Sequence, residues 1–91
     1  WNVVALDHRL APEHRFPAAV DEAWAALHAL RPAAVGGDSA GGTLAAVSAL
    51  HARDRGLPLA LQLLITPGTS PGGDSPSRRM FGDGFLLDAV T

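Results

Sequence analysis

The sequence predicts an α/β fold in which three parallel strands alternate with two helices, in β-α-β-α-β order. Two kinds of segment lead to this prediction: short apolar runs of strand length, and longer stretches with apolar residues at helical spacing. Because the two kinds alternate, right-handed crossovers lay the strands parallel, with the helices on the faces of the sheet. The chain has 91 residues, of which 47% are hydrophobic and 18% charged, a composition typical of a globular domain.

The first strand is predicted over residues 2–6, a short apolar run that includes β-branched side chains. Residues 8–16 are polar and contain proline, which indicates a loop. A helix is predicted over residues 18–30, because Pro17 is tolerated in a first turn and apolar residues then recur at helical spacing: Val20, Ala23, Trp24, Leu27 and Leu30. We therefore expect Trp24 in the core.

The second strand is predicted from its context. Residues 33–35 are apolar, but the run is too short to indicate a strand alone. A helix is predicted soon after it, because residues 40–53 are alanine-rich, contain no proline and are followed by Gly56. Residues 59–66 form a third apolar run between two prolines, which is typical of a strand buried on both faces.

The last part of the chain has a different composition. Glycine, proline and serine dominate residues 67–84, which indicates a long loop or cap segment, and a short helix is predicted over residues 85–90. We therefore divide the chain into a sheet core over residues 1–66 and a loop with the start of a cap or helix over residues 67–91. Apolar strand-like residues at the first positions indicate that residues 1–91 are a fragment of one larger domain.

The strongest functional signal is Gly-x-Ser-x-Gly over residues 37–41, between a predicted strand and a predicted helix. In this setting the serine occupies a tight turn, the nucleophile elbow, which exposes its hydroxyl for attack. Ser39 is therefore the candidate catalytic nucleophile, in a turn that strains its backbone by about 1–3 kcal/mol. We expect a Cβ at Gly37 or Gly41 to collide with the turning backbone or the neighbouring strand, and Gly42 to give further room.

The helix after Ser39 directs free backbone N–H groups at the reaction centre, and the N–H of Ala40 is the candidate oxyanion donor. Asp38 is interpreted as a structural part of the turn, because a triad acid orients a histidine and not the serine. The alternative for Ser39 is a residue that only caps the helix. A phosphate-binding loop over these glycines is disfavoured, because Thr43 stands where that loop needs a lysine.

Three segments extend this motif: residues 7–13 (DHRLAPE), 16–19 (FPAA) and 36–42 (GGDSAGG). With them the chain resembles the hormone-sensitive-lipase-like group of α/β-hydrolase esterases, which implies an α/β-hydrolase fold. The resemblance continues through residues 62–67 and 76–87 and so covers nearly the whole chain. Two features depart from that group, which usually has tyrosine in place of His8 and a longer connection at Arg31-Pro32.

The resemblance implies a carboxylic-ester hydrolase that acts on small acyl esters through a Ser–Asp–His triad, without metal or cofactor. Ser39 carries over as nucleophile and Ala40 as oxyanion donor. It also implies that the triad aspartate and histidine lie downstream of this segment and that a glycine-rich oxyanion loop lies upstream. We therefore expect the 91-residue chain alone to be inactive, and the alternative function is a truncated, non-catalytic folding or interaction module.

The composition excludes several other functions. A net charge of −2 and a pI near 6.0 give no reason to bind nucleic acid or an anionic membrane. The absence of cysteine excludes a thiol nucleophile, and no apolar run is long enough for a membrane span, so the default location is cytoplasmic. Four histidines lack metal-ligand spacing and are interpreted as surface or loop residues: His8, His14, His28 and His51. No oligomeric state is indicated.

The remaining acidic residues are not assigned to the catalytic triad. Asp74, Asp83 and Asp88 follow Ser39 in the chain but lie in the glycine- and proline-rich segment or its end, so they are interpreted as solvated loop acids. Glu13 is expected to pair with Arg9 or Arg15.

Overall fold

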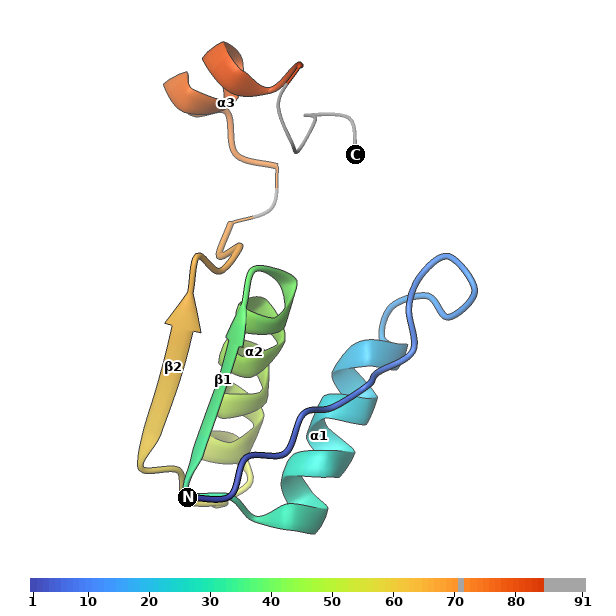
Figure 1. The fold of residues 1–91 in the computed structure, drawn as a ribbon, viewed down its shortest axis with the longest axis vertical. Helices are drawn as coiled ribbons and strands as arrows, with labels where there is room; N and C mark the ends of the chain where they lie inside the picture. Colours follow the sequence, from blue (N-terminus) through green and yellow to red (C-terminus); the bar gives the residue numbers. More distant parts are fainter. Residues whose placement is uncertain (71, 85–91) are drawn as a thin grey trace.

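The computed structural model describes residues 1–70 and 72–84. Its elements, in chain order, are α1 (Ala18–Leu30), β1 (Ala34–Asp38), α2 (Ala40–Asp54), β2 (Leu61–Ile65) and α3 (Pro76–Phe81) (Figure 1). The predicted α/β class and both long helices are confirmed. The short run at residues 33–35 overlaps only the start of β1, which continues through Gly36, Gly37 and Asp38, and the longer run at residues 59–66 contains β2.

The two strands are parallel, and they end at the same level. Their register pairs Ala34 with Leu61 at one end and Asp38 with Ile65 at the other. Close contact depends on a missing side chain, since a Cβ on Gly36 would lie 2.9 Å from the carbonyl oxygen of Leu63. The carboxyl ends of β1 and β2 therefore form one edge, from which the chain leaves each strand.

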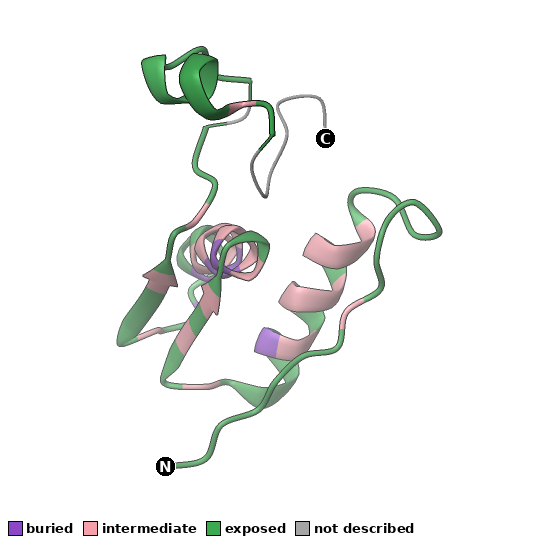
Figure 2. Cartoon of the chain, turned by 45° about the horizontal axis from the view of Figure 1, so that its top comes forward, coloured by how far each residue is buried: buried purple, intermediate pink, exposed green. Residues whose placement is uncertain are grey.

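The predicted strand over residues 2–6 is wrong. Within residues 1–70 and 72–84 the sheet consists of β1 and β2 alone, and the first ten residues run along α1 instead (Figures 1 and 2). An extended segment becomes a strand only when a neighbour pairs with its backbone groups. Here Val3 and Val4 remain 90% and 69% exposed, so the apolar character of the run alone does not place it in the sheet.

The core lies between the helices and the sheet. α2 packs on both strands, and α1 packs on α2; burial is concentrated on α2 and the facing end of α1 (Figure 2). Leu27, Ala52 and Leu57 form the buried cluster. Trp24 packs against this cluster, as predicted, and the guanidinium of Arg55 lies 4.8 Å from the centroid of its indole ring.

A third helix, α3, begins inside the segment predicted to be a loop or cap. Ser75 caps it by accepting a hydrogen bond from the backbone N–H of Arg78, and proline occupies its first turn. The short helix predicted over residues 85–90 lies outside the described residues. Among α1, α2 and α3, none has the length and apolar character needed to cross a lipid bilayer.

Candidate functional site

Ser39 lies at the turn between the end of β1 and the beginning of α2, at the carboxyl edge of the sheet (Figure 1). Its backbone has φ 55° and ψ −117°, a positive φ that is uncommon outside glycine and costs on the order of 1–3 kcal/mol. The N–H of Ser39 donates to the carbonyl of Ile65 at 2.8 Å. The turn is therefore fixed to β2 as well as to its own strand and helix.

The hydroxyl of Ser39 does not cap α2, although Ser39 occupies the capping position. The residue is exposed. Ser75 provides the contrast within the same chain, because its hydroxyl accepts from the Arg78 N–H at 3.3 Å and caps α3 in the ordinary way. Capping alone therefore does not account for a serine in a strained turn at this position.

The three glycines around Ser39 differ in how much space a Cβ atom would have at each position. A Cβ on Gly37 would lie 2.2 Å from the carbonyl carbon and oxygen of Gly41, which is the collision predicted for Gly37. The collision predicted for Gly41 is wrong, because its Cβ would meet no heavy atom within 4 Å among the described residues, apart from its chain neighbours and the adjacent backbone of its own helix. At Gly42 a Cβ would lie 3.0 Å from the Gly37 oxygen and 3.2 Å from Pro67, so this glycine allows close packing.

The first turn of α2 presents unpaired backbone donors beside Ser39. Ala40 is the first residue of the helix, so its N–H has no carbonyl acceptor inside the helix. The first helical bond runs from the N–H of Thr43 to the carbonyl of Ser39 at 3.1 Å. The first turn contains no acidic residue to neutralise the positive end of this helix. An anionic oxygen near Ser39 would therefore meet both N–H donors and a favourable field.

The turn that follows β2, residues 66–68, contacts the serine turn on both sides. The hydroxyl of Thr66 donates to the Asp38 carboxylate at 3.1 Å. The hydroxyl of Thr43, on α2, donates to the carbonyl of Gly68 and accepts from its N–H, both at 2.9 Å. Thr66 lies in the segment over residues 62–67 through which the resemblance continues, but the sequence contains no signal that assigns either threonine a role in the site.

The contacts of the histidines lie away from the turn that contains Ser39. His51 follows Ser39 by twelve residues on α2, which corresponds to roughly 18 Å along a helix axis. Its ring packs edge-on against Trp24, with 6.1 Å between ring centroids, and the ring of His28 lies 5.8 Å from the same indole. No histidine among the described residues forms a hydrogen bond with Ser39.

The predicted pairing of Glu13 with Arg9 or Arg15 is wrong, because Arg9 pairs with Glu22 on α1 and neither Glu13 nor Arg15 takes part in an ion pair within the described residues. The backbone N–H of Arg9 donates to Glu22 Oε2 at 2.7 Å, and its guanidinium Nε bonds to Oε1. The backbone hydrogen bond, followed by the side-chain bond, holds the pKa of Glu22 below its usual value. This contact fixes the loop before α1 and is distant in sequence from the serine turn.

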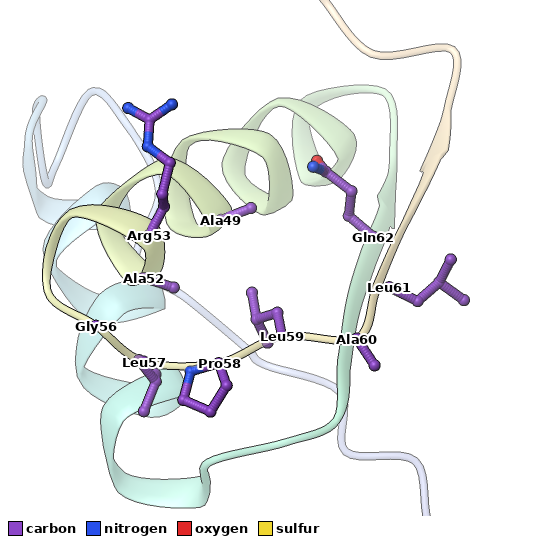
Figure 3. Close-up of a pocket in the computed structure, with 10 residues that line it drawn as sticks. All are labelled: Ala49, Ala52, Arg53, Gly56, Leu57, Pro58, Leu59, Ala60, Leu61 and Gln62. Carbon is purple, nitrogen blue, oxygen red and sulfur yellow. The ribbon is translucent and has the colours of Figure 1, made fainter.

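The hollow drawn in Figure 3 lies at the other end of the strands. It is lined by the last turns of α2, the connection through Leu57, and the first residues of β2, Leu61 and Gln62. Ser39, in contrast, bonds to Ile65 at the opposite end of β2. The hollow therefore contains none of the predicted site residues.

Comparison with known proteins identifies the family that this chain matches. Residues 1–91 match a family described as alpha/beta hydrolase fold. Esterase LipI of Mycobacterium tuberculosis (strain ATCC 25618 / H37Rv) is 46% identical over 98 residues, covering 94% of this chain and 31% of LipI. Carboxylesterase NlhH of the same strain is 44% identical over 98 residues, with the same coverage.

Solved structures agree with this result. A serine-to-alanine variant of LAE6, an alpha/beta hydrolase enzyme from the metagenome of Lake Arreo, Spain, superimposes with a TM-score of 0.81 at 44% identity. The match covers 90% of this chain and 30% of that one. The chain thus spans about a third of the length of the relatives it matches.

Proposed function

The chain belongs to the α/β-hydrolase fold family, and on that premise we propose that Ser39 is the nucleophile of a carboxylic-ester hydrolase. The observation that carries the proposal is the backbone of Ser39, strained at φ 55° between β1 and α2, with a hydroxyl that caps nothing. Two of its relatives, LipI and NlhH, are named esterase and carboxylesterase. The substrate class that we propose is a small acyl ester.

In the proposed reaction, the Ser39 oxygen attacks the ester carbonyl carbon while its proton passes to a histidine. The carbonyl oxygen becomes an oxyanion, which accepts a hydrogen bond from the N–H of Ala40 at the positive end of α2. The C–O bond to the alcohol then breaks, the alcohol takes the proton from the histidine, and the acyl group remains on Ser39. Attack by water releases the acid and restores the serine.

The histidine and the acid that orients it are proposed to come from the rest of a longer protein. The chain spans 31% of LipI, and its own described histidines contact Trp24 or the loop before α1. Loss of one triad member typically lowers the rate by about 10⁴- to 10⁶-fold. The 91-residue chain by itself is therefore expected to be inactive, and the proposal concerns the full-length protein.

The proposal is tested by covalent labelling of the full-length protein with a fluorophosphonate probe, which reacts with activated serines. We expect labelling of the wild type, and a modified peptide that contains Ser39. Ser39→Ala should abolish both labelling and hydrolysis of a p-nitrophenyl ester. Ser70→Ala is the matched control, because Ser70 is an exposed serine in the segment after β2. Labelling that persists in Ser39→Ala would exclude Ser39 as the nucleophile.

A further inference from the structure

The turn over residues 66–68 contacts the residue before Ser39 and the first turn of the helix after it. Thr66 bonds to Asp38 at the end of β1, and Gly68 bonds to Thr43 in the first turn of α2. The N–H of Ser39 itself bonds to Ile65, the residue that leads into this turn. Strand, serine and helix are thus all connected to one short segment that is at least 25 residues away in sequence.

The hydroxyl of Thr43 is well matched to Gly68. A hydroxyl has one hydrogen to donate and lone pairs to accept, and Thr43 uses both with the same residue, each at 2.9 Å. The carbonyl of Ser39 also lies 3.4 Å from this oxygen. A Cβ on Gly68 would lie 3.4 Å from the Thr43 oxygen, which is ordinary van der Waals contact, so the hydrogen bonds and not the missing side chain account for the pairing of these residues.

Thr66 is strained in the same sense as Ser39. Its φ is 44°, and a β-branched residue rarely adopts a positive φ, because its side chain then crowds the backbone. Such a conformation persists only where surrounding contacts determine it. Here the contacts are the bond from its hydroxyl to Asp38 and, two residues later, the bonds between Gly68 and Thr43.

We propose that Thr43 and Thr66 are positioning residues for the nucleophile, an inference that rests on the proposed function. Thr66 holds the residue before Ser39, and Thr43 holds the helical turn that carries the N–H of Ala40. Together they fix the direction of the Ser39 hydroxyl relative to that donor. Neither threonine touches the ester; each acts through the backbone around Ser39.

The test uses threonine-to-valine variants of the full-length protein, because valine keeps the shape of threonine and removes its hydroxyl. In Thr43→Val we expect kcat to fall by about 10- to 100-fold at nearly constant KM, since small displacements of reacting groups cause losses of that order. The rate of fluorophosphonate labelling should fall in parallel. Thr43→Ser keeps the hydroxyl and should restore most of kcat. Thr69→Val is the control. Thr69 lies in the same segment, but its side chain forms no hydrogen bond with the described residues.

A purely structural role predicts a different result, a lower melting temperature with kcat unchanged in the folded protein. If Thr43→Val does not fold, Thr66→Val carries the same test through its bond to Asp38. A folded valine variant with wild-type kcat and labelling rate would overturn the inference while leaving the proposed function intact. A wild-type protein that neither labels nor hydrolyses esters would overturn both.

Discussion

The side chain that Gly37 lacks would occupy the space of the Gly41 carbonyl group. The Cβ position of Gly37 lies 2.2 Å from both the carbon and the oxygen of that carbonyl. Since both atoms belong to the backbone, neither can rotate away as a flexible side chain would. The turn around Ser39 can therefore close this tightly only with glycine at position 37.

Gly37→Ala should lower the free energy of unfolding of the full-length protein by about 1–3 kcal/mol or more, through overpacking of this turn. Gly41→Ala is the matched control, because its Cβ meets no heavy atom within 4 Å among the described residues outside its chain neighbours and the adjacent backbone of its own helix. A helix also favours alanine over glycine by up to about 1 kcal/mol. Chemical denaturation measures the free energy of unfolding of both variants. Equal destabilisation by Gly37→Ala and Gly41→Ala would contradict this account.

Ser39→Gly should be more stable than Ser39→Ala by about 1 kcal/mol, although neither variant has a nucleophile. The reason is the φ of 55°, which glycine adopts without the steric cost that a Cβ imposes, partly offset by its greater entropy in the unfolded state. Thermal unfolding of the two variants makes the comparison. If the alanine variant is equally stable, the backbone at this position carries no strain.

Glu22 should make the stability of the protein depend on pH. Its hydrogen bonds from Arg9 lower its pKa in the folded state below the value of 4.5 that applies to the unfolded chain, so the unfolded state takes up a proton first as pH falls. The stabilisation is therefore fully present above that value and is lost as pH falls through the lower, folded-state pKa.

The variant Glu22→Gln tests whether stability falls with decreasing pH because of Glu22. The difference in unfolding free energy between wild type and variant should be largest near neutral pH and should shrink as pH falls through 4.5 and then through the lower pKa of the folded state. Glu13→Gln is the control, because the structure shows Arg9 bonded to Glu22 and not to Glu13. A difference that stays constant with pH would mean that the pair does not affect the titration.

Local patterns were sufficient to predict α1, α2 and β2, whereas β1 was predicted from its context. The apolar spacing along α1 and the proline-free composition of α2 are properties of consecutive residues, and the structure confirms both helices. The run at residues 2–6 has equally apolar character, but a strand also needs a partner, which no pattern within the run specifies. The helix α3 was missed because its cap, Ser75 followed by proline, lies among many other serines and prolines.

Among the site residues, too, those that belong to one local pattern were predicted, and those that depend on contacts distant in sequence were missed. Ser39 and its neighbouring glycines form a contiguous motif whose geometry follows from a strand that turns directly into a helix. Thr43 and Gly68 are 25 residues apart, and Thr66 and Asp38 are 28 apart. Their contacts depend on the register between β1 and β2, which the sequence alone does not determine.

Two adjacent glycines in β1 also limit how this protein can evolve. Gly36 faces the Leu63 carbonyl of β2, and Gly37 faces the Gly41 carbonyl of α2, so two of the five positions of the strand are closed to larger residues. We therefore expect variation at these two positions to be limited to glycine, whereas the other three positions of the strand do not face this steric limit. If Ser39 is the nucleophile, as we propose, the strand that leads to it should tolerate substitution less well than the segments that would contact the ester.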